Sequence, residues 1–481
     1  MWVILQHQQE RVRELLRRGQ YDDASLSGWG RLDELVAMMV GLGLFEVLGS
    51  LGTEIKKSCF IPRWLINNAL ALKAIVGEPS LNAMQEGMLR DATILRLMGC
   101  TAKEIEEGFD TARNKGDHKP FHVDTIRYAI SKTPEEEVDR GWQEALRLLA
   151  KKTRVFSKGL FIMDSTDLIL DGDYEGIGIR RIVRKYLDKG GQVGVQVKEE
   201  KGFKLVTLSC LYKQHLFVLA WRLIPINQHE ITVSDELIED GLTLLGAGAI
   251  KILLIDRGFL DGARLKGWKE QGIDTIVPLK SNMDILEDMR GLARIGCGVK
   301  AKRGGLELLG FSDLETLDSY EGKLNGLLVT RYKGERVQGD KQWGFITTLP
   351  TEKPKQVLKA YDEYDKRSLV ENKENRELKQ GWFLKRFPGK SKRAQKVHLL
   401  FCLLMFNVVN LFKSGLGERF IDRGVRRLRR ELLSSRDKVI VYAGEWYGIF
   451  DLREFLTLLG RPPSGKLDNA RIRLAAAGIP P

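Results

Sequence analysis

The chain has 481 residues, of which 43% are hydrophobic and 8% aromatic, as expected for a globular protein with more than one structural unit. Its five cysteines are scattered and form no Cys-x-x-Cys pair. This excludes a disulfide framework and a cysteine-rich zinc site, and it indicates a reducing compartment. The net charge of +13 indicates an anionic partner, with nucleic acid as the first candidate.

The first 150 residues are predicted to be helical. Residues 1–54 form a helical lead-in, whose initial apolar run of four residues is too short for a signal peptide. Residues 55–150 have apolar positions at helical spacing, which predicts a helical domain. Within it, the predicted helices at 101–109 and 123–131 lie too far apart for a helix-turn-helix. A plain bundle is therefore favoured, and contact with DNA ends stays open.

Strand patterns begin near residue 159 and alternate with helices. The expected order is strand 160–163, hairpin 203–226, helix 234–245, strand 250–255, helix 261–272 and strand 275–279. This order is typical of an α/β layer.

Two of these strands run directly into an aspartate, Asp164 and Asp256. A strand that ends in a polar turn would explain either one alone. Because α/β sheets hold their sites at strand carboxyl ends, two such residues instead predict carboxylates that converge on a divalent metal ion. A third acid is expected from a helix, and Glu371 is the candidate, with Arg367 and Tyr364 one and two turns before it on one face.

Residues 285–349 are rich in glycine and in short strand-like runs, which predicts a β-rich insertion. A long charged helix without Gly or Pro is predicted between Lys355 and Gln380. The apolar run 399–412 is predicted to be a buried helix, because its fourteen residues are fewer than the roughly 20 that span a bilayer.

Nearly all of the net positive charge lies between Arg376 and Lys438, where 17 Lys and Arg stand against five Asp and Glu. A solvated helix face would explain one basic run, but this concentration favours the DNA backbone as its partner. The candidate contacts are Arg426, Arg427, Arg429 and Arg430.

The motifs "MDSTD", "LIDRGF" and "YDKRSLVE" resemble, in order, the three acidic motifs of DDE transposases of the IS4-like insertion-sequence group. Asp256 follows Asp164 by 92 residues and Glu371 follows Asp256 by 115, which leaves room for the insertion. The resemblance implies a ribonuclease H-like mixed α/β sheet with a β-rich insertion, an all-α N-terminal bundle before it and a basic C-terminal tail after it.

The expected parts are a helical lead-in (1–54), an N-terminal helical domain (55–150), the first part of the catalytic core (151–284), the β-rich insertion (285–349), the second part of the core (350–415) and a basic C-terminal region (416–481).

The resemblance also implies an activity: cleavage of DNA at terminal inverted repeats and joining of the ends to target DNA. Asp164, Asp256 and Glu371 would hold two Mg²⁺ ions, and Mn²⁺ would also support activity. Tyr364 and Arg367 would position the scissile phosphate. The implied protein is a homodimer on double-stranded DNA, in the cytoplasm, associated with the nucleoid and not with a membrane.

Three points stay open at this stage. The family Lys seven residues after the Glu is replaced by Leu378, so Lys379 or another residue makes that phosphate contact. Glu374 is an alternative third ligand, although the spacing from Tyr364 favours Glu371. The alternative functions are a metal-dependent DNA nuclease without strand transfer and a transposase-derived DNA-binding protein that no longer cuts.

Overall fold

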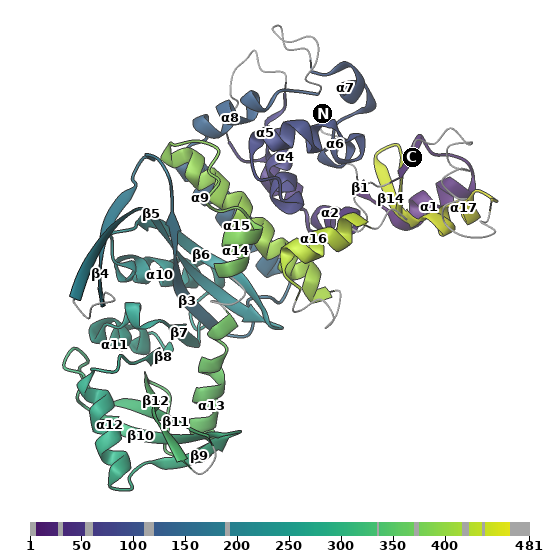
Figure 1. The fold of residues 1–481 in the computed structure, drawn as a ribbon. Helices are drawn as coiled ribbons and strands as arrows, with labels where there is room; N and C mark the ends of the chain where they lie inside the picture. The colour runs from purple at the N-terminus through teal and green to yellow at the C-terminus, as the bar shows by residue number, and fades with distance from the viewer. Residues whose placement is uncertain are drawn as a thin grey trace. The chain divides into compact units, whose positions relative to one another are not determined.

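The computed structural model describes residues 6–26, 32–52, 61–109, 120–187, 193–333, 336–369, 375–415, 423–434 and 438–461. The chain forms two compact units (Figure 1). The terminal unit combines residues 1–153 with 377–481, and the central unit is the continuous segment 154–376. Residues 377–415, predicted to complete the catalytic core, thus belong to the terminal unit.

The terminal unit contains β1 (Gln6–His7), α1 (Gln9–Arg17), β2 (Asp23–Leu26), α2 (Leu32–Leu42), α3 (Leu44–Gly49), α4 (Arg63–Val76), α5 (Leu81–Glu86), η1 (Met88–Arg90), α6 (Ala92–Met98), α7 (Ala102–Glu107), α8 (Val123–Lys132), α9 (Glu135–Lys152), α14 (Arg376–Gly381), α15 (Lys392–Gly415), α16 (Val425–Ser434), β13 (Lys438–Ala443), β14 (Trp446–Asp451) and α17 (Leu452–Leu458).

Helix α15 forms the core of the terminal unit. It has 24 residues, and those from Val397 to Asn410 are buried on every side, because α2, α4, α8 and α9 pack around it. The apolar run 399–412 therefore predicted a helix correctly but not its full length. By length and composition α15 could cross a membrane, yet 89% of its most apolar window is buried inside the protein, as in the core helix of a globular unit.

Two adjacent asparagines on α4 are buried in this apolar core and bind backbone carbonyls there. Asn67 Nδ2 donates hydrogen bonds to the carbonyls of Leu48 and Leu51, at 2.8 and 2.9 Å, and Asn68 Nδ2 donates to that of Met98 at 3.0 Å. These carbonyls lie at the C-terminal ends of α3 and α6, where helices lack internal partners. The pair thus fixes two helix ends against α4.

Arg429 on α16 is a buried charged residue that binds helix-end carbonyls in the same way. It donates from Nε to Ile75 O and from Nη2 to Ala74 O, both at 2.6 Å, and from Nη1 to Gly381 O. Its guanidinium also lies 4.9 Å from the ring centroid of Trp382. Burial lowers the pKa of Arg429 to about 10, so the side chain stays charged at neutral pH. It joins the C-terminal ends of α4 and α14.

A four-stranded sheet brings the two ends of the described chain together. Its order is β1-β14-β13-β2, so the C-terminal hairpin lies between two N-terminal strands. Helices α1 and α17 cover one face, where Val12, Leu16, Phe450 and Phe455 are buried. The N-terminal region is helical as predicted. The short strands β1 and β2 were not predicted, because their partners lie more than 400 residues away in the sequence.

The central unit contains β3 (Leu160–Ile169), β4 (Gly178–Leu187), β5 (Val193–Tyr212), β6 (His215–Pro225), η2 (Glu230–Val233), α10 (Ser234–Leu245), β7 (Ile252–Ile255), η3 (Arg257–Phe259), α11 (Gly262–Glu270), β8 (Asp274–Pro278), α12 (Asp284–Arg294), β9 (Val299–Arg303), β10 (Leu306–Leu314), β11 (Leu324–Lys333), β12 (Arg336–Thr347) and α13 (Pro354–Asp365).

One ten-stranded mixed sheet runs through the central unit. Strands β6, β5 and β3 are antiparallel, and β3, β7 and β8 are parallel, which confirms the ribonuclease H-like core. Strand β12 pairs antiparallel with β8, so the meander β9–β12 extends the same sheet. The predicted β-rich insertion is therefore a continuation of the core sheet. It begins with helix α12, which the prediction did not include.

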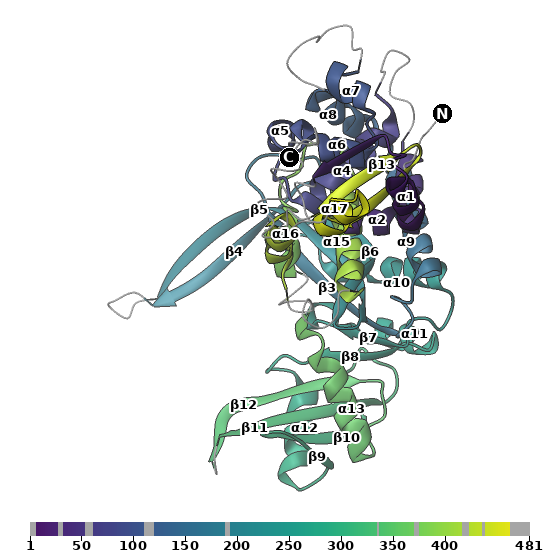
Figure 2. The ribbon, with the colours of Figure 1, turned by 90° about the vertical axis from the view of Figure 1, so that its right-hand side faces the viewer.

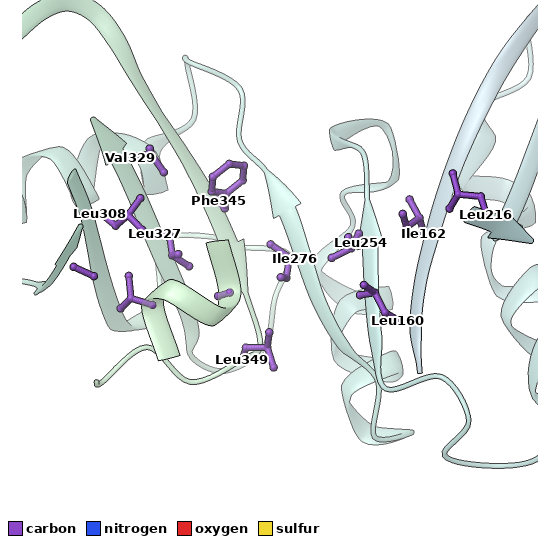
Figure 3. Packing of buried hydrophobic residues seen from close by; sticks show 13 residues of the cluster. Leu160, Ile162, Leu216, Leu254, Ile276, Leu308, Leu327, Val329, Phe345 and Leu349 are labelled. Atoms are coloured by element: carbon purple, nitrogen blue, oxygen red, sulfur yellow. The ribbon is translucent and has the colours of Figure 1, made fainter. Parts of the chain in front are cut away.

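A single apolar cluster crosses the junction between core and insertion (Figure 3). Ile162 of β3, Leu254 of β7 and Ile276 of β8 continue into Phe345 of β12, and α13 packs on this cluster through Val357. Packing on both sheet halves fixes α13 against the core. The position of α13 determines where the residues after it lie.

The buried arginine supplies a test of the packing in the terminal unit. We expect Arg429→Ala to lower the free energy of unfolding by about 2–4 kcal/mol, because three carbonyls lose a charged donor. The neighbouring exposed Arg430→Ala should change it by less than ~0.5 kcal/mol. Urea unfolding followed by tryptophan fluorescence measures both, and equal effects would contradict this role of Arg429.

Candidate active site

The register between β3 and β7 places Asp164 beside Asp256. These strands are parallel, and their last paired residues are Met163 and Ile255, each followed directly by the aspartate. Neighbouring strands lie about 4.8 Å apart, so the two carboxylates start from adjacent points of the backbone. The predicted convergence of the two side chains is thus present in the structure.

One detail of that prediction is wrong. Asp164 does not end its strand, because β3 continues to Ile169 through antiparallel pairing with β5. It is β7 that ends, at Ile255, so Asp164 lies where the parallel partner of β3 leaves the sheet. The site therefore sits in the middle of a continuous strand, which holds Asp164 more firmly than a strand end would.

The guanidinium of Arg367 lies between the two carboxylates. Its Nη1 is 3.9 Å from Asp164 Oδ1, and its Nη2 is 3.6 Å from Asp256 Oδ1. The side chains of Asp164 and Arg367 are only 9% and 12% exposed, whereas Asp256 is 37% exposed. Burial opposes the charge of Arg367, but Tyr364, Asp256 and Asp164 outweigh it and raise the pKa of the guanidinium. Two carboxylates thus share one cationic group.

Tyr364 anchors this arginine to the sheet. Its ring packs on Phe345 of β12, with 4.1 Å between the centroids, and its hydroxyl accepts a hydrogen bond of 3.1 Å from Arg367 Nε. The Tyr364 and Arg367 pair that the motif singled out therefore acts as one element, positioned by the core–insertion junction.

The prediction of one continuous helix between Lys355 and Gln380 is wrong. Helix α13 ends at Asp365, and the chain continues in a tight turn in which the Arg367 amide donates to Tyr364 O at 2.8 Å. Residues 370–374 lie outside the described residues, and helix α14 is described from Arg376. An uninterrupted charged pattern does not reveal this break, whose effect is to bring Arg367 to Asp164 and Asp256.

The "DRGF" motif has a steric explanation at the end of β7. Phe259 is fully buried and anchors the short helix η3, whose preceding residue is Asp256. A Cβ at Gly258 would lie 2.4 Å from Glu230 Oε1, so a larger residue there would displace this carboxylate. Lys204 in turn holds Glu230 in an ion pair of 2.5 Å. These contacts fix the backbone that carries Asp256.

Asn375 is a site residue that the sequence reasoning missed. Its Nδ2 donates a hydrogen bond of 2.8 Å to Asp164 Oδ2, while Asp164 Oδ1 faces Arg367. No pattern distinguishes Asn375 from its polar neighbours in a charged segment. Only the break after α13 brings it to the carboxylate.

The third acid lies outside the described residues, as does Glu374. For Glu371 the structure thus gives no position, and within the described ranges no group of three His, Cys, Asp or Glu side chains could hold a metal ion. The two aspartates nevertheless fit such an ion. They are oxygen donors, the type that Mg²⁺ and Mn²⁺ prefer, and they converge on a positive charge. Lys379 is half-buried in the terminal unit, whereas its neighbour Leu378 is fully buried.

The basic segment is partly used inside the terminal unit. Arg429 is 9% exposed and bonded to carbonyls, so the expectation that it contacts DNA is wrong. Its burial follows from the apolar face of α16, a face that charge counting cannot reveal. Lys396 pairs with Glu135 and Asp139 on α9, both at 3.1 Å. The exposed arginines of α16 that remain are Arg426, Arg427 and Arg430.

The residues of this site fall within the match to a known protein family. A family model described as "Transposase DDE domain" matches residues 156–408, more than half of the chain. No curated protein matches the chain significantly. Among solved structures, it is similar to a cryo-EM structure of the piggyBac transposase synaptic complex with hairpin DNA, at 11% identity and a TM-score of 0.34, over 96% of this chain and 84% of that chain.

The assignment therefore rests on the family match, which spans both aspartates and the Arg367 turn. The chain belongs to the transposase DDE domain family and is a DDE-type transposase, an enzyme of DNA transposition.

Proposed function

We propose that this transposase cleaves double-stranded DNA at the terminal inverted repeats of an insertion sequence and joins the freed 3′ ends to target DNA. The proposal includes membership of the IS4-like group, which the acidic motifs support. Asp164, Asp256 and Glu371 are its three catalytic acids. The observation that carries the proposal is the Arg367 guanidinium shared by two carboxylates in register on β3 and β7.

The acids would hold divalent metal ions, on which DDE transposases generally depend, and Mg²⁺ is the proposed ion with Mn²⁺ as a substitute. When bound, such ions polarise the phosphoryl oxygens and activate the attacking water or 3′-hydroxyl. The protein itself holds the carboxylates in place. Asp164 is fixed by the strand backbone and by Asn375, and Asp256 by the packing of η3.

Arg367 and Tyr364 would position the scissile phosphate. An arginine can donate two parallel hydrogen bonds to a phosphate, and Tyr364 limits the rotation of this one. The attacking group is water or a 3′-hydroxyl, so no side chain forms a covalent intermediate with DNA. Lys379 and the exposed arginines of α16 would contact the DNA backbone. We further propose that two copies act on paired ends, in the cytoplasm at the nucleoid.

The acidic residues give the direct test. Asp164→Asn, Asp256→Asn and Glu371→Gln should each slow cleavage of a labelled end duplex by about three orders of magnitude, or ~4 kcal/mol, because each loses a charged ligand. Affinity for the same duplex should stay nearly unchanged. Glu374→Gln is the matched control and should retain most activity.

Two outcomes would contradict the assignment. Cleavage at the wild-type rate by either aspartate variant would remove that residue from the site. Loss of cleavage in Glu374→Gln but not in Glu371→Gln would move the third ligand. Strand-transfer product on a supercoiled target separates transposition from simple nuclease activity, because a nuclease leaves only cut ends.

Asn375 offers a test of how Asp164 is oriented. Asn375→Ala removes the donor to Oδ2, and we expect the Mn²⁺ concentration for half-maximal cleavage to rise about tenfold, as for other residues that orient metal ligands. Mn²⁺ affinity, measured by calorimetry on the DNA-free protein, should fall in parallel, with an unchanged unfolding midpoint. An unchanged metal affinity would show that the hydrogen bond has no positioning role.

The salt dependence of DNA binding tests the basic helix. Neutralising Arg426, Arg427 and Arg430 together should flatten the slope of log affinity against log salt by about 2–3, at ~0.9 per phosphate contact. Neutralising Lys392 and Lys396, which pair with Glu135, is the control and should change the slope by less than ~1. Equal changes would show that the helix is not a specific DNA contact.

A further inference from the structure

Strands β4 and β5 form a two-stranded ribbon that extends beyond the rest of the central sheet (Figure 2). Within the described ranges, β4 pairs only with residues 193–202 of β5, while β3 and β6 pair with β5 from residue 202 onwards. Both edges of the ribbon are thus without strand partners there. An isolated two-stranded ribbon is marginally stable in water at best, so its side chains need some other source of stability.

On one face of the ribbon, charged side chains form ion pairs with other residues of the same chain. Arg180 of β4 contacts Glu200 at 2.8 Å and Asp167 at 2.6 Å, and Lys198 contacts Glu200 at 2.9 Å. The hydrogen bonds from Arg180 and Lys198 lower the pKa of the Glu200 carboxyl, so the network is charged at neutral pH. This face needs no partner.

The opposite face carries four exposed apolar residues. Ile179, Val183, Val195 and Val197 are 49%, 59%, 56% and 58% exposed, and within the described residues only two other large apolar side chains are exposed to a similar degree. Side chains alternate between the faces of a strand, and Val183 pairs directly with Val197, so all four lie on the same face. We name Ile179, Val183, Val195 and Val197 the valine face.

A clustered apolar surface of this kind marks a protein interface more than a DNA contact. Residues that bind DNA are mainly polar or basic, because they face phosphates and base edges. The charged positions of this face are instead of both signs, with Lys201 opposite Ile179 and Lys185 opposite Val195 in addition to Arg181 and Glu199. Arg181 and Glu199 pair across the two strands on this face, with 2.8 Å between Nε and Oε1, and both are well exposed.

The valine face is complementary to itself. Consider two copies packed face to face around a two-fold axis that runs along the ribbon. Each row keeps its height, but β4 of one copy then lies over β5 of the other. Val183 therefore meets Val197 of the second copy, and Arg181 meets Glu199 of the second copy, twice over by symmetry. In the two central rows valine meets valine and opposite charges meet, while Ile179 and Val195 lie opposite Lys201 and Lys185 of the second copy. The two central rows point to another copy of this chain as the occupant.

We propose that the valine face is a homodimer interface through which the β4–β5 ribbons of two copies pack face to face. The inference rests on the proposed function, in which two copies act on paired DNA ends. Its test measures association without DNA or metal. Failure here would leave the cleavage proposal intact, and failure of cleavage would leave this one intact.

The first experiment compares two adjacent positions on opposite faces of the same strand. Val197→Lys places a charge in the valine face, and Gln196→Lys places the same charge on the other face. In sedimentation equilibrium on the full chain, we expect Val197→Lys to raise the dimer dissociation constant at least ~30-fold, as at the centre of an interface. Gln196→Lys should change it by less than ~3-fold. Circular dichroism checks that both variants are folded.

The second experiment uses charge reversal in two separate proteins. Arg181→Glu gives a face with only acids in this row, and Glu199→Arg gives one with only bases. Each protein alone should dissociate, because like charges meet across the two-fold axis. An equimolar mixture should regain wild-type association, because every contact in the mixed dimer joins opposite charges. A role of the pair within one chain cannot produce this rescue, so the result also excludes misfolding.

Three results would overturn the proposal. A wild-type protein that stays monomeric at tens of micromolar forms no such dimer. Equal effects of Val197→Lys and Gln196→Lys, or no rescue in the mixture, would place the interface elsewhere. Unchanged self-association in Val197→Lys together with altered affinity for a short DNA duplex would make the ribbon a DNA contact.

Discussion

The parallel register of β3 and β7 is the constraint on which the site depends. It brings Asp164 and Asp256 side by side, although their charges repel and Asp164 is buried. The Arg367 guanidinium lies between the two carboxylates and offsets this repulsion. The fold thus concentrates negative charge at one point of the sheet, where cations are attracted. Such a site suits an enzyme of phosphoryl transfer, because this chemistry needs positive charge beside the phosphate.

The insertion contributes to that site although none of its strands carries a catalytic acid. Strand β12 continues the core sheet, and its Phe345 supports Tyr364, which holds Arg367. Two contacts thus connect the insertion to the arginine between the carboxylates: the ring contact of Phe345 with Tyr364, and the hydrogen bond of Tyr364 with Arg367. This connection explains why a β-rich segment between the second aspartate and the arginine turn forms one sheet with the core instead of a separate lobe.

Local patterns predicted the strands, the two aspartates and the Tyr364–Arg367 pair, because each leaves a trace within a few residues. They failed where the structure depends on distant partners. Helix α13 packs against β9 and β10, and neither the turn after it nor the contact of Asn375 with Asp164 leaves a trace in the local pattern. Arg429 looked like a DNA contact because charge counting cannot tell a buried arginine from an exposed one. The strands β1 and β2 have partners at the other end of the chain.

The interleaved order of the two units bears on how the protein is made. The central unit is one continuous segment, so all of its strands are synthesised before residue 377. The terminal unit instead waits for α15 and for the hairpin β13–β14, which pairs with strands from the first 26 residues. Domains fold as they emerge, so the catalytic sheet matures first and the unit rich in basic residues last. A nascent chain therefore completes the sheet that carries Asp164 and Asp256 before it can assemble helix α16.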